Sequence, residues 1–478
     1  MIRWLFLLFL AGCTLGPDHC PPEVCMPERF KEEPELAEKI DYTDWWKQFN
    51  DPLLDTLIDE ALCCNLDLRI ALRRIEEVRG LFRIDSSRLF PQISGNMVAI
   101  RSRRSANLTS DIIESTGAPT EIFATDFTGA LIDNFFQVGF DAIWELDFFG
   151  RNRKRAEAAF HDFEATQEEA LFIQVSLLSD VARNYIEICT LQRQILIQKE
   201  QIVRSRELLE LAESRYAAGL TSYVDVQRAT AALETRTSEL PLLQEARGQT
   251  IHALAVLLGC PPESFLKRFD TCNCVPIAMG RIPSGLPSEL LCRRPDIRRA
   301  DRELAAATAR IGEAKADFFP QFSLTGSFGS QSNLLDKLFV WPSRFWSIGP
   351  SMVWELFTGG RLVAQVKVAN ERQKQAILNY EKVIYEAFQE VEDRLLGFFK
   401  EEERLESLEE KVAANSELRD LLMDQYCAGL ISLDDVLRAE NDLFLSQQEM
   451  VFSTRTLMVQ LVGLYKALGG GWDCCDLQ

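Results

Sequence analysis

Apolar residues recur at intervals of seven along two long stretches of the chain. The first series comprises Val181, Ile188, Ile195, Ile202, Leu209 and Tyr216, and it continues through Val226, Leu233, Leu240 and Leu254. The second comprises Val391, Phe398, Leu405, Val412 and Tyr426, is interrupted at Arg419, and continues through Val436, Leu443, Met450, Leu457 and Leu464. Heptad spacing is typical of helices that pack along a shared apolar seam. It predicts two antiparallel helical hairpins of coiled-coil type, over residues 151–258 and 361–468.

The hairpin helices are expected to be unusually long. The first, from Arg151 to Tyr216, would measure about 100 Å at the rise of an α-helix. Pro241 lies inside the returning helix, where it should bend the helix without ending the pattern.

A strict alternation of apolar and polar residues precedes each hairpin. Before the second hairpin Phe322, Leu324 and Phe328 alternate with Ser323, Thr325 and Ser327. Before the first, Phe136, Val138, Phe140, Ala142, Trp144 and Leu146 alternate with positions that include Gln137, Asp141, Glu145 and Asp147. A period of two is typical of strands with two different faces. We therefore expect four strands, over residues 91–108, 131–149, 319–331 and 344–357.

The polar faces of these strands carry acids, namely Asp141, Glu145, Asp147 and Glu355. A water-soluble sandwich would bury the apolar face and expose the acids. In a transmembrane barrel the apolar face would instead meet lipid, and the acids would face a water-filled lumen. Four strands cannot enclose a pore, so the second interpretation requires several chains to form one barrel.

Helix, strands and hairpin belong to a duplicated unit. The segment Tyr216–Val226 returns 210 positions later as Tyr426–Val436, and Trp144–Arg151 returns at the same offset as Trp354–Arg361. The first repeat would span residues 51–259 and the second 295–468, each with a helix that a proline (Pro91 or Pro320) ends before the strands. A connector rich in Pro and Cys, 260–294, would join them, and 469–478 would form a tail. A repeat of this length favours a scaffold built from like parts.

The N-terminus predicts export. Residues 1–12 have a short positive start and an apolar run, and they end in small residues before Cys13. This resembles a lipoprotein signal peptide, with Cys13 as the lipidated residue; an ordinary signal peptide is the alternative. Residues 13–50 contain several prolines and predict an extended tether. The twelve other cysteines permit disulfides, for which Cys20/Cys25 and Cys260/Cys272/Cys274/Cys292 are the best clusters.

Composition excludes some functions. The net charge of −20 argues against a nucleic-acid partner, which would require a basic face. The three histidines, His19, His161 and His252, lie in no motif for nucleophilic or metal catalysis, so we expect neither an enzyme nor a cofactor. The Cys272-Asn-Cys274 spacing is not that of a zinc knuckle, and no metal site is expected.

The hairpin tips, near 217–222 and 427–432, carry the candidate functional residues. Gly219 and Gly429 would end one helix, and Ser222 with Asp225, or Ser432 with Asp435, would begin the next. The geometry of a tight helical hairpin can account for all of these. It does not account for the apolar Leu220 and Leu430 at exposed turns, which suggest docking to a partner helix. Asp434 beside Asp435 would form an acidic ring if several copies met there.

Several motifs together resemble the TolC-like outer-membrane efflux family, in its lipoprotein branch that serves resistance-nodulation-division (RND) pumps. They are Cys13-Thr-Leu-Gly-Pro17, Trp45-Trp46 with Phe49-Asn-Asp51-Pro52 and Leu57-Ile58, Leu257-Leu258-Gly259, Arg293-Arg294-Pro295-Asp296-Ile297, Ile311-Gly-Glu-Ala with Phe319-Pro320, and both tips. The resemblance implies a mainly α chain with a transmembrane β part. Its duplicated hairpins would form a periplasmic α-barrel, and its four strands would contribute to the β-barrel of a homotrimer.

The resemblance also implies roles for single residues. Cys13 would be the lipid anchor, and the tips 219–222 and 429–432 would contact a periplasmic adaptor (membrane fusion) protein. Asp435 matches the family's gate position. The residue three further on, often acidic in relatives, is Arg438 here, so a salt bridge would replace part of the acidic ring.

The implied function is that of a passive conduit. The protein would lie in the outer membrane with a lipid anchor and a long periplasmic extension, and it would conduct substrates received from the adaptor and an inner-membrane RND pump. Two alternatives stay open: a conduit for type I protein secretion, and a lipid-anchored coiled-coil spacer that conducts nothing.

Overall fold

The chain divides into two compact units. The computed structural model describes residues 14–22, 30–31, 42–103, 132–264, 269, 276 and 290–472. The first unit, here called the sheet unit, comprises Met1–Cys20, Arg79–Asp162 and Leu304–Gln375. The second, here called the hairpin unit, comprises Pro21–Val78, Phe163–Glu303 and Ala376–Gln478. Each unit takes a segment from both sequence repeats.

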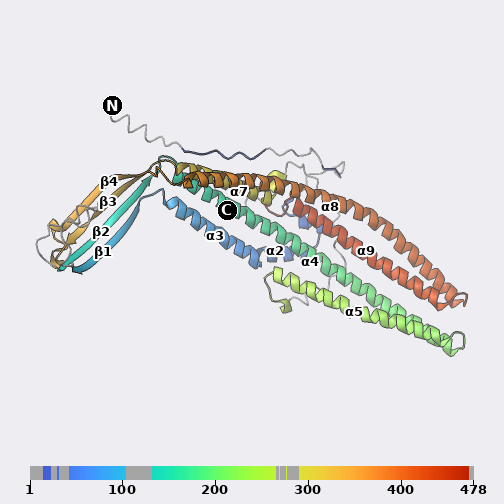
Figure 1. The fold of residues 1–478 in the computed structure, drawn as a ribbon. Coiled ribbons are helices and arrows are strands. Elements are labelled where there is room, and N and C mark those ends of the chain that lie inside the picture. Colours follow the sequence, from blue (N-terminus) through green and yellow to red (C-terminus); the bar gives the residue numbers. More distant parts are fainter. Residues whose placement is uncertain are drawn as a thin grey trace. The chain divides into compact units, whose positions relative to one another are not determined.

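The sheet unit contains one antiparallel sheet of four strands in chain order (Figure 1). The strands are β1 (Gln92–Arg103), β2 (Ile132–Leu146), β3 (Gln321–Ser332) and β4 (Arg344–Val353). Strands β1 and β4 are therefore the edges. Pro350 lies in β4, where the edge of the sheet tolerates a residue without an amide hydrogen. The described sheet agrees with the expected four strands.

Strand boundaries differ in detail from those expected. Strand β2 ends at Leu146 and β4 at Val353, because the chain turns at the residues that follow toward the next helix. Residues 104–108 and 131, which were expected to be in strands, lie outside the described residues.

The helices repeat the duplication. Helices α4 (Arg151–Ala217) and α8 (Arg361–Cys427) each have 67 residues, and α5 (Tyr223–Leu257) and α9 (Leu433–Ala467) each have 35. Helices α3 (Leu66–Ser87) and α7 (Pro295–Ala316), which precede the strands, each have 22. Matching lengths confirm that two copies of one unit form the long hairpins. Helix α5 continues through Pro241.

The hairpin unit has its main apolar core where the long helices meet the first short ones. The 3-10 helix η1 (Trp45–Phe49) and helix α2 (Pro52–Cys64) pack into this core, and Trp45 stacks on Tyr465 of α9 with ring centroids 5.2 Å apart. The Asp51 carboxylate accepts the Leu53 amide at 2.9 Å and so caps α2. Because Trp45, Trp46 and Phe49 are buried, the tether predicted over 13–50 ends before η1.

Shorter elements complete the described chain. They are the helix α6 (Leu290–Arg293) and the 3-10 helices η4 (Pro262–Ser264), η6 (Leu335–Lys337) and η7 (Trp341–Ser343). Among the described residues, no helix combines the length and the apolar character that crossing a membrane would require.

Some predictions concern residues that the structure does not describe. The signal peptide 1–12 and Cys13 lie outside the described residues, as do most of the connector 260–294 and residues 473–478 of the tail. Cys25, Cys272 and Cys274 are also outside, so the expected clusters are only partly visible. The thiols of Cys20, Cys260 and Cys292 form no disulfide with any residue that is described.

Candidate functional site

Both hairpin tips end their first helix with a glycine in the left-handed conformation. Gly219 has φ of 73° and Gly429 has φ of 77°. The backbone then closes in the same way in both copies: the Leu220 amide donates to the Arg215 carbonyl, and the Leu430 amide donates to the Gln425 carbonyl, each at 2.9 Å. A side chain would strain this conformation, so the glycines are required by the turn.

The second helix of each tip begins with a serine cap, and the two caps differ. At the first tip the Ser222 hydroxyl accepts the Val224 amide at 3.2 Å. At the second, Asp435 completes a capping box, in which its carboxylate accepts the Ser432 amide at 3.3 Å and the Ser432 hydroxyl at 2.7 Å. The hydroxyl and amide of Ser432 lower the pKa of Asp435 below its ordinary value. Asp435 is thus held as a carboxylate by its cap.

Apolar side chains remain exposed at both tips. Leu220 is 69% exposed and Leu430 is 75% exposed. Tyr216 and Tyr223, which flank the first tip, are also exposed and have ring centroids 5.4 Å apart. The tips therefore offer uncovered apolar surface held on rigid helix ends, as a docking site for a helix requires.

The candidate gate residues form a charge cluster that involves the first hairpin. Arg438 Nη2 lies 2.7 Å from the Asp434 carboxylate, one turn away on α9. Arg228 of α5 lies 3.8 Å from the same carboxylate. Arg438 therefore pairs with Asp434, while Asp435 is occupied by the cap. In a single copy, Asp434 is therefore paired with arginine, and Asp435 is hydrogen-bonded to the neutral groups of Ser432.

Arg215, which was not among the residues predicted from the sequence, connects the two tips. Its Nη1 donates to the carbonyl oxygen of Tyr426 at 2.6 Å, and its guanidinium lies 4.5 Å from the centre of the Tyr426 ring. Tyr426 is buried, and burial raises its pKa. A difference between the repeats could have identified this contact: Arg215 is replaced by Gln425 in the second copy, although the neighbouring tyrosine is repeated.

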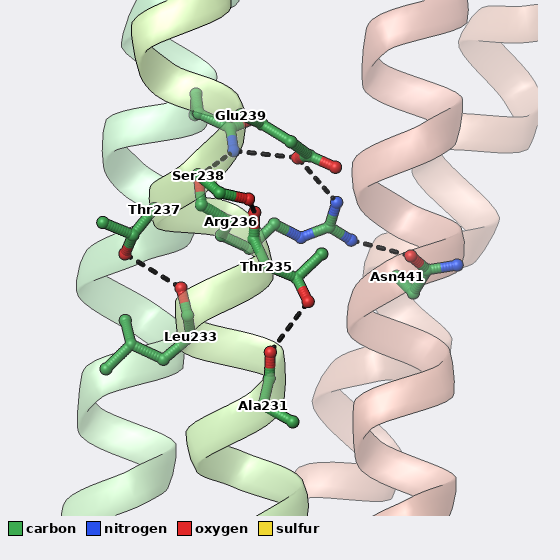
Figure 2. A network of polar contacts seen from close by, with 9 residues as sticks. Ala231, Leu233, Thr235, Arg236, Thr237, Ser238, Glu239 and Asn441 are labelled. Carbon is green, nitrogen blue, oxygen red and sulfur yellow. Dashed lines mark hydrogen bonds and ion pairs between the residues drawn. The ribbon is translucent and has the colours of Figure 1, made fainter.

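A third arginine joins the hairpins further from the tips (Figure 2). Arg236 of α5 donates from Nη2 to Asn441 of α9 at 2.7 Å and from Nη1 to Glu239 at 3.2 Å. Its guanidinium also lies 4.0 Å from the centre of the Phe444 ring. Gln198 of α4 donates to the Arg236 carbonyl at 2.6 Å and so ties α4 to α5 at this level. Arg215, Arg228 and Arg236, here called the hairpin bridge, all extend from the first hairpin to the second.

The sheet has two chemically different faces. Cross-strand pairing aligns Ser94, Asp141, Ser327 and Ser347 in one polar row, in which the hydroxyls of Ser327 and Ser347 are 2.7 Å apart. The neighbouring row, on the opposite face, contains Phe140, Phe328 and Trp346. These three side chains are 62%, 57% and 74% exposed in the single chain. A soluble sandwich would cover this face, and nothing in the described chain does so.

The four acids predicted to line the polar face fall into two groups. Asp141 and Glu145 lie in β2, where Asp141 accepts a hydrogen bond from Asn96 and Glu145 lies 3.5 Å from Arg151. Asp147 lies beyond the strand and accepts the Arg153 amide at the start of α4 at 2.9 Å. Glu355 also lies beyond its strand and pairs with Arg361 at the start of α8. The last two therefore belong to the strand-to-helix junctions, since their strands end earlier than expected.

No cluster of three or more His, Cys, Asp or Glu side chains arranged to hold a metal occurs within the described ranges.

Comparison with known proteins covers nearly the whole chain. A family model described as "Outer membrane efflux protein" matches residues 57–260 and 286–470. The solvent efflux pump outer membrane protein SrpC of Pseudomonas putida is 34% identical over 98% of this chain and 97% of its own. The cation efflux system protein CusC of Escherichia coli K12 is 30% identical over 98% and 99%. The solved structure of the outer-membrane channel OprN, 29% identical, covers 96% of this chain and 100% of its own with a TM-score of 0.87.

Proposed function

Because this chain belongs to the outer membrane efflux protein family, we propose that it is the outer-membrane channel of a tripartite efflux system. The observation that carries the proposal is the two-faced sheet, whose polar row faces away from an exposed aromatic row. A strand with one apolar and one hydrated face fits a wall between lipid and water. The channel would conduct passively, and the pump would supply the energy.

The sheet also supports assembly from several copies. Strands β1 and β4 are edges: each pairs on one side only, and the described chain offers neither of them a second strand. An open sheet edge is not tolerated in the hydrocarbon region of a membrane, so each edge must pair with another chain. We infer a homotrimer, in which β1 of one copy pairs with β4 of the next and the polar rows together line the lumen.

The tips are the proposed contact with the periplasmic adaptor. Leu220 and Leu430 supply apolar surface, and the caps at Ser222 and Ser432 hold it rigidly. The adaptor would in turn connect the channel to an RND-type inner-membrane pump. Asp434, Asp435 and Arg438 would lie near the threefold axis as the gate, and the hairpin bridge would oppose opening because it ties both hairpins of one copy together.

Lipidation of Cys13 is proposed to anchor the mature chain in the outer membrane. The residue follows a signal-peptide pattern and begins the motif Cys13-Thr-Leu-Gly-Pro17. Mass spectrometry of the N-terminal peptide would test this, because a mature chain that begins elsewhere would exclude it.

Single-channel recording in planar bilayers tests the proposed conduit. The purified wild-type protein should give rare, small openings. Arg215→Ala should open more often, because the Tyr426 carbonyl loses the hydrogen bond from Arg215 and the Tyr426 ring loses the guanidinium that lies over it. Arg204→Ala, a substitution on the same helix away from the tip, is the control. A properly folded protein that gives no current in either form would support a non-conducting spacer and reject the proposal.

A further inference from the structure

The start of the described chain lies in a notch built from glycines. The Leu15 amide donates to the Phe149 carbonyl at 3.4 Å, between the end of β2 and the start of α4. A methyl carbon added to Gly150 would lie 3.1 Å from two atoms of Thr14. One added to Gly312 of α7 would lie only 2.5 Å from the Leu15 carbonyl oxygen. Thr14 and Leu15 therefore lie directly against the backbone of both elements.

The fit is reciprocal. Gly16 has φ of 131°, and a methyl carbon added to it would lie 2.6 Å from the Gly312 Cα. Two backbones approach so closely at this point that neither position can carry a side chain without displacement. A polar contact alone would not require this, so the arrangement indicates a steric seat for the segment.

Two neighbours crowd Gly312: a methyl carbon added there would lie 2.5 Å from the Leu15 carbonyl oxygen and 3.0 Å from Cγ of Lys154. It lies within α7, where glycine is less favourable than alanine. Gly80 of α3 provides a contrast, because a methyl carbon added there would meet nothing within 4 Å. Gly312 thus gives up helix stability at a position where its lack of a side chain admits the Leu15 carbonyl, the nearer neighbour, beside the Lys154 side chain.

The walls of the notch are fixed by buried contacts. Lys154 is 5% exposed, its amide donates to the Gly150 carbonyl at 2.8 Å, and its side chain passes beside Gly312. The Arg155 Nε donates to Glu313 of α7 at 2.7 Å, which joins the beginning of α4 to the helix that carries Gly312. The walls of the seat are therefore also held to each other by contacts that do not involve the segment.

We propose that Gly150 and Gly312 form a docking seat for Thr14–Pro17 and thereby fix the height at which residue 13 is presented, beside the junction of β2 and α4. This inference rests on the proposed function, because it assumes that Cys13 carries the lipid anchor. Thr14 is bonded to Cys13, so a seated Thr14 would hold the acyl chains close to the ends of the lipid-facing strands. The anchor and the barrel would then enter the same leaflet in register.

Hydrogen exchange of the purified, lipidated protein, followed by mass spectrometry, tests the seat. Gly312→Ala should increase exchange in the peptide that contains Leu15 by tenfold or more, because the new methyl group displaces the Leu15 carbonyl. Gly80→Ala is the matched control, since it makes the same substitution in a helix with open space. Gly16→Ala should reproduce the effect of Gly312→Ala without altering α7, and it serves if Gly312→Ala does not fold.

The outcomes are distinct. Fast exchange at Leu15 in the wild type, or no increase in Gly312→Ala and Gly16→Ala, would overturn the seat, and so would an equal increase in Gly80→Ala. Cys13→Ser should leave exchange at Leu15 slow, because polypeptide contacts form the seat. If exchange at Leu15 is slow but the protein gives no current in planar bilayers, the seat is supported and only the proposed channel function is rejected.

Discussion

The indole nitrogen of Trp144 donates a hydrogen bond to the carbonyl oxygen of Leu89 at 3.0 Å. Its counterpart 210 residues later, Trp354, donates to Phe318 at 3.1 Å. Each acceptor lies two residues before the proline that precedes a strand. The same contact therefore occurs in both repeats: a tryptophan near the end of a strand donates a hydrogen bond to the chain just after the preceding helix. Tryptophan is also the residue favoured where membrane meets water.

Trp144→Phe and Trp354→Phe should each destabilise the sheet unit by about 1 kcal/mol, since each leaves one carbonyl without its donor. The measurement is hydrogen exchange at the end of α3 or α7, together with the thermal midpoint in detergent. Trp346→Phe is the control, because that indole is 74% exposed and has no hydrogen bond within the described chain. An equal effect at Trp346 would attribute the change to ring size.

Arg419→Leu should destabilise the second hairpin although it restores the heptad series. Arg419 Nη1 lies 3.3 Å from Glu440 of α9, which is 7% exposed. Removing the arginine leaves a buried carboxylate unpaired, at a cost of about 3 kcal/mol.

The double variant Arg419→Leu/Glu440→Leu should recover most of that loss, because two apolar residues then meet on the seam. Unfolding midpoints of the single and double variants form the cycle. If the double variant is no more stable than Arg419→Leu, the buried pair is not the cause.

Acid should loosen the second tip before the first. The pKa of Asp435 is lowered from 3.8 by its bonds to Ser432, so the folded value lies below the unfolded one. The cap is therefore fully effective above pH 3.8 and is lost as pH falls through the lower folded pKa. Protection of the first turn of α9, taken as the measured exchange rate relative to the intrinsic rate at the same pH, should fall on acidification across that range.

Asp435→Asn should lower this protection and make it independent of pH over the same interval. Asp225→Asn at the first tip is the matched control, because Ser222 caps α5 through Val224 instead. Equal pH dependence at both tips would contradict the role assigned to Asp435.

Arg294→Met should be among the most damaging substitutions in the hairpin unit. Arg294 is 7% exposed and donates to Asp296, to Glu390 of α8 and to the Ala467 carbonyl at the end of α9. Burial disfavours its charge, yet the hydrogen bond and charge of Asp296 and the charge of Glu390 outweigh burial and raise its pKa.

Loss of this centre should cost about 3 kcal/mol and lower the unfolding midpoint. Arg293→Met removes an exposed neighbour that lies over the Tyr42 ring, and it should cost much less. Similar losses in both variants would mean that the charge itself, and not its burial, matters.

Periodicity was enough to predict the architecture of this chain. Heptads and alternation depend only on which face of a helix or strand is apolar, and the duplication supported each prediction twice. The 210-residue offset is reproduced by the starts of α4 and α8 and of α5 and α9. The left-handed glycines at 219 and 429 were also predictable, because the local geometry of a helical turn requires them.

Contacts between segments distant in sequence were not predictable. Periodicity does not link Leu15 to Gly312, because this pair depends on how distant segments are placed side by side. For Arg215 the difference between the repeats marks the residue, but it does not name Tyr426 as the partner. Asp147 and Glu355 were assigned to strands since alternation continues past the last paired residue. The hydrogen bonds and ion pairs that draw them toward Arg153 and Arg361 cannot be read from a period of two.

The open margins of the sheet have a genetic consequence. If β1 of each copy pairs with β4 of its neighbour, the ring of chains closes only when both edge strands of every copy can form hydrogen bonds. A chain with a damaged margin would still fold its hairpins, enter the ring and leave it unsealed. When intact and damaged copies are made together, the loss of working channels should exceed the share of damaged chains, so such mutations should be dominant rather than recessive.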